Sequence, residues 1–302
     1  MRAPVLTEKM RDHLAVIMVF ISPACFCSNM LLARAMAGTL PPVTMAVLRW
    51  GLVALLLGIA LWPQIRAHLP ALRAEAGQII WLGGLGMGLC GAPIYLAGHY
   101  TTATTIGLIY SVCPLLILAF GFGLYRVAVR PAAALGMVCG FIGVAVILIR
   151  GDLSVLAGLA FNTGDLLVVV GTLAFAFYSL GLKYRASALP PMLRFAACAA
   201  AGALWHLPFL GYELVVQNQT VTFSSDVLAA IAVLVFISSI GAYLSYGYIV
   251  ARLGAARAGA VLYIVPVYNA VFAILLLGEV LSAYHLIGLS LILPGLWLAN
   301  RG

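Results

Sequence analysis

Charge is scarce in this chain of 302 residues: Lys, Arg, Asp and Glu together make up 8% of it, and only eight residues are acidic. A soluble globular domain carries roughly 25% charged residues. Hydrophobic residues make up 65% of the chain, and its mean hydropathy is +1.15. This composition excludes a water-soluble protein and indicates an integral membrane protein surrounded by the lipid bilayer.

Clusters of catalytic or metal-binding residues are also missing from the sequence. The eight acidic residues lie at or beyond the ends of the apolar segments: Glu8, Asp12, Glu75, Asp152, Asp165, Glu213, Asp226 and Glu279. Cys25 and Cys27 are two residues apart, so they point to different faces of a helix and do not form a metal pair. We therefore predict no enzymatic activity, no cofactor and no bound metal. The lack of mid-membrane carboxylates also argues against a strongly proton-coupled pump.

Long apolar segments are abundant, and turn residues or charges separate them. A spanning helix needs about 20 apolar residues. The ten predicted spans are 14–33, 43–62, 78–99, 102–124, 132–149, 165–182, 192–211, 227–250, 256–277 and 282–299. Only short loops remain, so we predict an all-α membrane protein with a single integral membrane domain.

The second half of the sequence repeats the first. The matched pairs are Leu31/Leu180, Ala37/Ala186, Leu40/Leu189, Pro41/Pro190 and Pro42/Pro191 at a spacing of 149, then Ala103/Ala255, Gly107/Gly259, Pro114/Pro266, Phe120/Phe272, Leu124/Leu276, Gly136/Gly288 and Gly143/Gly295 at a spacing of 152. A chance alignment of Leu- and Ala-rich helices is the alternative. Because each half holds five spans, an odd number, the second half enters the membrane from the opposite side. We predict two inverted five-helix repeats, residues 1–150 and 151–302, an arrangement typical of transporters.

The positive charges are distributed asymmetrically. The net charge is +8, and 13 of the 16 Lys and Arg residues fall on one side if the N-terminus is cytoplasmic. The exceptions are Arg34, Arg49 and Arg150. This pattern follows the positive-inside rule. It predicts a multi-pass membrane protein with both termini in the cytoplasm and no nucleic-acid partner.

Polar and aromatic residues recur at helical spacing on several spans. Polar groups avoid lipid, so we expect these faces to point into the bundle, where they either pack between helices or bind substrate. The candidate substrate-binding residues are Asn29, Tyr95, His99, Tyr110, Ser111, Tyr178, Ser239, Tyr243, Tyr246, Tyr263 and Asn269.

Two prolines and three charges complete the candidate site. Pro114 and Pro266 lie mid-span, where each frees a backbone carbonyl, so they are candidate positions for helix kinks or gating. Arg49, Asp165 and Glu279 are candidate outer-mouth charges. Arg49 lies seven residues past Pro42, so its side chain either reaches the outer surface or binds a substrate carboxylate. Asp165 alternatively complements the dipole at the start of its helix.

Small residues mark the fifth and tenth spans. Gly136, Gly140 and Gly143 lie on one helix face, and Gly288 and Gly295 repeat the pattern. Such faces allow close helix packing. We interpret these spans as scaffold or as a dimer surface, and the sequence leaves a monomer and a homodimer equally open.

The C-terminal motif resembles a known family. The segment 266–279, with Leu281-Ser282 and Ile287-Gly288 after it, resembles the closing signature of the drug/metabolite transporter superfamily in its EamA-type ten-helix branch. Residues 101–114 are similar to the matching segment of the first half, and Leu48-Arg49 resembles the second helix of the family.

The resemblance implies a central cavity, lined by helices 1, 3, 4, 6, 8 and 9, that binds a small molecule. The chain is similar to bacterial aromatic amino acid exporters, which implies export of aromatic or hydrophobic amino acids across the bacterial inner membrane by alternating access. The alternative is a broad-specificity drug/metabolite exporter of neutral or zwitterionic molecules. The first half departs from the pattern, because Arg126 and Val127 stand where Gly278 and Glu279 stand in the second. A role that needs a symmetric pair of acids is therefore disfavoured.

Overall fold

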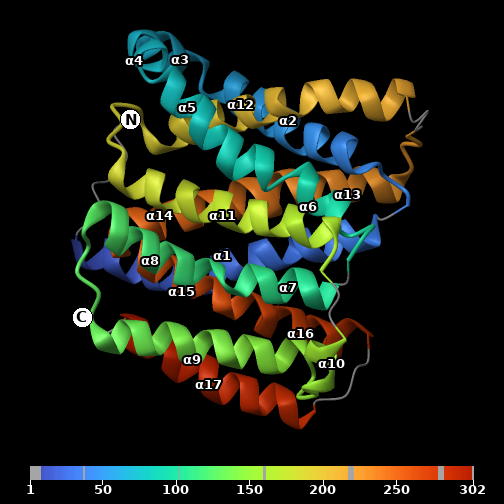
Figure 1. Ribbon diagram of the computed structural model, residues 1–302. Helices are drawn as coiled ribbons and strands as arrows, with labels where there is room; N and C mark the ends of the chain where they lie inside the picture. The colour runs from blue at the N-terminus through green and yellow to red at the C-terminus, as the bar shows by residue number, and fades with distance from the viewer. Residues whose placement is uncertain are drawn as a thin grey trace.

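The computed structural model describes residues 8–36, 38–101, 103–158, 161–216, 221–277 and 282–300, and all regular structure in these ranges is helical (Figure 1). The first half contains α1 (Glu8–Ala35), α2 (Pro42–Ala60), α3 (Trp62–Ala67), α4 (Leu69–Ala74), α5 (Ala76–Gly83), η1 (Gly84–Leu89), α6 (Ala92–Ala97), α7 (Ala103–Ser111), α8 (Cys113–Tyr125) and α9 (Pro131–Leu148). After α10 (Ser154–Ala157), the second half contains α11 (Thr163–Tyr184), α12 (Pro191–Gly211), η2 (Tyr212–Val216), α13 (Ser225–Val235), η3 (Phe236–Gly241), α14 (Ala242–Leu253), α15 (Ala255–Val261), η4 (Leu262–Ile264), α16 (Val265–Leu277) and α17 (Ala283–Asn300).

These helices form the predicted membrane spans. Among the described residues, eight helical stretches are long and apolar enough to cross a membrane, and Ala283–Ala299 is a shorter apolar helix. The remaining predicted span, 256–277, is divided into α15, η4 and α16. The prediction of an all-α protein with ten transmembrane helices in two inverted repeats is confirmed. The short helices α3 and α4, which connect α2 to α5, were not predicted.

The backbone is irregular at equivalent places in the two halves. The π-helical turns η1 and η3 are displaced by 152 residues at both ends, the same spacing that relates Pro114 to Pro266. The fourth span breaks between α7 and α8, directly before Pro114, and the ninth span breaks at η4, directly before Pro266. These two spans are therefore divided rather than simply kinked. π-Helical turns are frequent at functional sites, and both halves carry one in the corresponding helix.

The fifth and tenth spans pack against each other within the chain, where Figure 1 shows α9 and α17 side by side at one edge of the bundle. A Cβ atom added to Gly136 would lie 2.4 Å from the Gly295 carbonyl oxygen, and one added to Gly143 would lie 2.7 Å from that of Gly288. Gly288 and Gly295 are the repeat equivalents of Gly136 and Gly143, so a two-fold operation exchanges the two contacts. The small faces thus join the halves to each other, as a scaffold.

We predict that Gly136→Ala destabilises the protein. The new methyl group meets a backbone carbonyl, so α9 and α17 must separate, at a cost of about 1–3 kcal/mol. The matched control is Gly58→Ala in α2, because a Cβ atom there meets nothing within 4 Å. We expect the melting temperature in detergent to fall for Gly136→Ala and to hold for Gly58→Ala. Equal melting temperatures would contradict the packing role of Gly136.

The core lies between the two halves. α2 packs against α12, α1 against α14, and α8 against α15, so each pair takes one helix from each half. The large buried cluster is correspondingly built from both halves, with Trp50 and Leu82 from the first and Leu193 and Tyr246 from the second. Residues at this junction therefore contact both halves of the chain.

Candidate functional site

Arg49 on α2 is the centre of a buried polar cluster. Its side chain is 2% exposed, so it does not extend to the outer surface. Arg49 Nε donates to Ser239 Oγ at 2.6 Å, and Nη2 donates to the Ser238 carbonyl oxygen at 2.7 Å. Nη1 donates to Asn29 Oδ1 at 2.8 Å and to the Tyr95 hydroxyl at 2.7 Å. We call these five residues the Arg49 cluster.

The Arg49 cluster joins the two halves of the protein. Its members come from α1, α2 and α6 in the first half and from η3 in the second. The Tyr95 hydroxyl also donates to Asn29 Oδ1 at 2.7 Å, and Ser28 Oγ lies 2.6 Å from Ser238 Oγ. The sequence predicted Asn29, Tyr95, Ser239 and Arg49 as site residues but missed Ser238, whose contribution is a backbone carbonyl in a π-helical turn.

Aromatic rings pack beside the guanidinium group. We define the aromatic cluster as Phe26, Trp50, Phe175, Tyr178, Phe195, Tyr243 and Tyr246. Tyr243 is central, and its ring centroid lies 5.0 Å from that of Trp50 in an edge-to-face arrangement. The Arg49 guanidinium carbon lies 4.4 Å from the Trp50 centroid and 6.0 Å from that of Tyr243. Both distances are within the range of a cation–π attraction.

The two π-helical turns are bound in a reciprocal way. Arg49, from the first half, donates to the carbonyl of Ser238 in η3, and the Tyr243 hydroxyl, from the second half, donates to the carbonyl of Gly86 in η1 at 2.8 Å. Gly86 and Ser238 are 152 residues apart, so they are repeat equivalents. Each half therefore satisfies an irregular backbone carbonyl of the other, which couples the two central helices.

Three predicted tyrosines belong to this packed core. Tyr178, Tyr243 and Tyr246 are each at most 5% exposed. The Tyr246 hydroxyl lies 2.7 Å from Ser179 Oγ, and the Tyr178 ring packs on Gly86 so closely that a Cβ atom there would lie 2.5 Å from it. In this conformation their rings contact one another and do not line open space. Substrate binding by these residues stays a prediction.

The fourth and ninth spans meet unevenly along their length. A Cβ atom on Gly259 in α15 would lie 3.5 Å from Pro114 Cα and 3.7 Å from Ile117 Cβ in α8. Residues 258–261 are buried at this contact. In contrast, residues 106–110 of α7 and 266–269 of α16 are only half-buried. The α8–α15 contact is therefore tight, whereas these residues of α7 and α16 are less buried than those of α15.

Several candidate residues lie outside the Arg49 cluster. Tyr110 is half-buried on α7, and Ser111 Oγ donates to the Leu108 carbonyl of its own helix at 2.7 Å. Tyr263 packs against Gly140 of α9, and its buried hydroxyl has no partner among the described residues.

Asn269 links α16 to α1, whereas His99 is excluded from the interior. Cys27 Sγ donates to Asn269 Oδ1 at 2.7 Å, and Asn269 Nδ2 lies 3.8 Å from Met30 Sδ. His99 was expected on the inner face of the third span, and this expectation is wrong. Helix α6 ends at Ala97, so His99 lies in the following turn and is exposed.

Of the two predicted outer-mouth acids, the structure describes Asp165, which lies at a helix start. Asp165 is 2% exposed and forms a capping box at the start of α11, accepting from the Asn162 backbone N–H at 2.8 Å. Its other oxygen accepts from the Thr101 hydroxyl. Asp165 therefore secures a helix start, as the dipole alternative predicted. Glu279 lies outside the described residues.

Glu213 was missed by the sequence reasoning. It is 4% exposed in η2, and its carboxylate accepts from the backbone N–H of Val43 at 2.9 Å and of Thr44 at 2.7 Å. This arrangement caps the first turn of α2, where Pro42 supplies no N–H. Glu213 thereby fixes the helix that carries Arg49. In the sequence, the only sign of this cap was a carboxylate just beyond one span together with backbone N–H groups at the start of another span that lack a helical partner.

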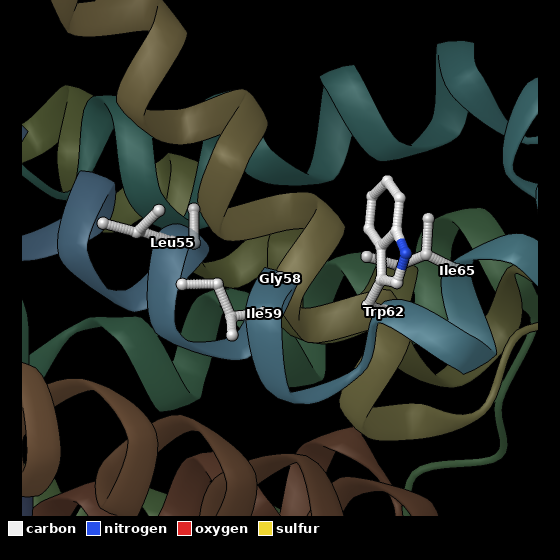
Figure 2. A pocket seen from close by; sticks show the side chains of 6 residues that line it. Leu55, Gly58, Ile59, Trp62 and Ile65 are labelled. Carbon is white, nitrogen blue, oxygen red and sulfur yellow. The ribbon is translucent and has the colours of Figure 1, made fainter.

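A groove on the outside of α2 is mainly apolar and exposed, unlike the buried polar Arg49 cluster (Figure 2). It has a volume of ≈ 580 Å³ and is lined by Ala54, Leu55, Gly58, Ile59, Trp62 and Ile65. Leu55, Ile59 and Trp62 are each more than half exposed. In a membrane, such a mainly apolar surface contacts acyl chains, and the indole N–H of Trp62 is the one polar side-chain group in its lining.

The family comparison matches both halves of the chain. The model described as the EamA-like transporter family matches residues 13–149 and 162–301. The chain is 24% identical over 277 residues to the uncharacterized transporter YyaM of Bacillus subtilis strain 168, covering 89% of this chain and 88% of that one. It is 27% identical over 223 residues to an uncharacterized transporter of Archaeoglobus fulgidus, covering 71% and 73%.

A solved crystal structure has the same fold. It superposes with a TM-score of 0.71 at 22% sequence identity, covering 95% of this chain and 96% of the other. At this identity the likeness describes the architecture alone. Together with the two family matches, it agrees with an arrangement in which both halves form one membrane-embedded unit.

Proposed function

This chain belongs to the EamA-like transporter family, and from that premise we propose that it exports amino acids, aromatic or hydrophobic ones, across the bacterial inner membrane by alternating access. The family consists of transporters, so a small-molecule substrate and a lipid bilayer are its expected partners. The domain boundaries 1–150 and 151–302, the cytoplasmic termini and the substrate are part of this proposal.

The observation that carries the substrate proposal is the junction of the Arg49 cluster with the aromatic cluster. The buried guanidinium group of Arg49 lies against aromatic rings that come from both halves. An amino acid with a large apolar side chain has the complementary chemistry, a carboxylate next to an apolar body. Aromatic pairs prefer offset or edge-to-face contacts, and the rings that now pack on one another supply such surfaces.

The uneven closure of the fourth and ninth spans supports alternating access. With the N-terminus in the cytoplasm, the tight α8–α15 contact faces the cytoplasm and the less buried residues of α7 and α16 face outward. The divided helices before Pro114 and Pro266 provide positions at which each span can bend. We interpret this conformation as closed to the cytoplasm, the state from which an exporter releases its substrate.

A broad drug/metabolite exporter is the second candidate. The aromatic cluster favours it in one respect, because ring faces contact many planar apolar molecules without directional hydrogen bonds. This candidate differs from the first in one expectation: an apolar organic cation is carried as well as an amino acid.

The test is counterflow into proteoliposomes with labelled phenylalanine, threonine and an organic cation. We expect phenylalanine to accumulate above protein-free vesicles and above threonine, with equal rates in the presence and absence of a pH gradient. The expected independence from pH follows from the lack of a predicted mid-membrane carboxylate. Preferred uptake of the organic cation would favour the second candidate. Absence of flux for the whole amino acid panel would refute amino acid export.

A further inference from the structure

Among the residues that the structure describes, only neutral groups bind the guanidinium group of Arg49. In the described part of the chain, its guanidinium group donates to two hydroxyls, one amide oxygen and one backbone carbonyl. The side chain is 2% exposed, so bulk water does not screen its charge. A buried charge is strongly unfavourable unless it is paired. These hydrogen bonds and the cation–π contact with the Trp50 ring compensate it only in part. The site therefore favours an incoming anion.

Two donors of the cluster converge on one oxygen atom. Asn29 Oδ1 accepts from Arg49 Nη1 at 2.8 Å and from the Tyr95 hydroxyl at 2.7 Å. The Tyr95 hydroxyl in turn accepts from Arg49, which orients its proton toward Asn29. A carboxylate oxygen at the same point would accept the same two bonds, and these would be stronger because both partners of the arginine bond would be charged.

Asn29 lies on the accessible side of this pair of donors. Arg49 and Tyr95 are buried, whereas Asn29 is half-buried. Met30 and Asn269, which contact each other between α1 and α16, are half-buried as well. A ligand entering at the α7–α16 end therefore meets Asn29 before it meets Arg49.

We infer that Arg49 Nη1–H and the Tyr95 hydroxyl bind one carboxylate oxygen of the substrate, and that Asn29 Oδ1 occupies this position when the site is empty. The inference rests on the proposed transport function and specifies which substrate group is recognised. The buried acids Asp165 and Glu213 bind backbone donors at helix starts, so neither faces a substrate ammonium group at this cluster. The recognised class is an apolar or aromatic monocarboxylate, with or without an amino group.

The first test compares ligands that differ at a single group. The full chain is purified in detergent, and Kd is measured by calorimetry for 3-phenylpropionate, phenylalanine, phenylalaninamide and phenethylamine. We expect both carboxylates to bind and the amide and the amine to bind at least tenfold more weakly. Equal binding of phenylalanine and its amide, or no binding of either carboxylate, would overturn the inference.

The second test uses two substitutions of Asn29 with opposite expected effects. Asn29→Asp places a permanent carboxylate on the two donors, so the melting temperature should rise and 3-phenylpropionate should bind at least tenfold more weakly. Asn29→Ala removes the internal occupant without adding charge, so 3-phenylpropionate should bind as tightly as in the wild type or more tightly. A purely structural Asn29 would lower affinity in both variants, and that result would contradict the inference.

Transport assays separate this inference from the proposed function. If carboxylates bind but are not carried across proteoliposomes, the anion site stands and the transport proposal fails. If phenylalanine and phenylalaninamide are carried at equal rates, the transport proposal stands and the anion site fails.

Discussion

A disulfide between cysteines at positions 117 and 259 is expected to abolish transport. In the double variant Ile117→Cys with Gly259→Cys, the two Cβ atoms would lie 3.7 Å apart, because a Cβ atom built on Gly259 has this distance to the Ile117 Cβ. Disulfides span Cβ atoms at about 3.5–4.5 Å. The bond would join α8 to α15 at the closed end of the helix pair and prevent that end from opening. We expect flux into proteoliposomes to fall below about a tenth of the wild-type rate after oxidation and to recover with a reductant.

Each single cysteine variant is the matched control for this experiment. It carries one of the two substitutions, so any loss of flux that persists in a single variant reports a packing defect and not the cross-link. The six native cysteines are present in all of these variants. If the oxidised double variant cross-links fully and transports at the wild-type rate, the α8–α15 contact does not open during transport, and alternating access through this contact is refuted.

The inverted repeat also indicates which contact should form when the cytoplasmic end opens. Gly107 is the repeat equivalent of Gly259, and Pro266 is that of Pro114. In this conformation Gly259 faces Pro114, but a Cβ atom on Gly107 would instead meet Leu148 of α9 at 2.9 Å. The halves therefore share a sequence pattern but differ in its use. If the two halves exchanged conformations, Gly107 would lie against Pro266 and the outer end would close. This exchange is the expectation for two inverted halves.

Hydropathy was sufficient to predict the spans, because a helix in a bilayer must satisfy its own backbone and bury apolar residues over a fixed length. The repeat was visible in glycines and prolines because those residues constrain the backbone itself. Gly136 and Gly143 illustrate this point, since their spacing predicted a close helix contact that α17 provides.

The chemistry of the site was less accessible to sequence reasoning. Ser238 acts through a carbonyl that a π-helical turn redirects, and side-chain identity does not reveal such a turn. Helical spacing placed Tyr95 and His99 on one face, but α6 ends between them, so only Tyr95 reaches Arg49. The sequence showed only that Glu213 lies beyond the end of a span. It did not show that its carboxylate caps a helix distant in sequence. These contacts depend on tertiary packing, which spacing along one helix does not specify.

Tyr243→Ala is expected to be the most destabilising single substitution in the aromatic cluster. Tyr243 contacts the rings of Phe26, Trp50, Phe195 and others, and it is 5% exposed. Truncation of a large buried aromatic residue costs about 3–5 kcal/mol, because a cavity remains. We expect a large fall in melting temperature, measured by fluorescence-detected size exclusion after heating. Tyr243→Phe keeps the ring but leaves the Gly86 carbonyl without its donor, so a smaller loss of about 1–3 kcal/mol is expected.

Rescue by a small molecule distinguishes the packing role of Tyr243 from a general folding defect. p-Cresol has the ring and hydroxyl of the tyrosine side chain, and engineered cavities in protein cores bind small aromatic molecules. We expect p-cresol to raise the melting temperature of Tyr243→Ala and to leave that of the wild type unchanged, with toluene less effective because it lacks a donor for Gly86. Melting temperatures of Tyr243→Ala and Tyr243→Phe that do not differ would contradict the central packing role. In that case the hydrogen bond between the two halves, and not the ring, would account for the contribution of Tyr243.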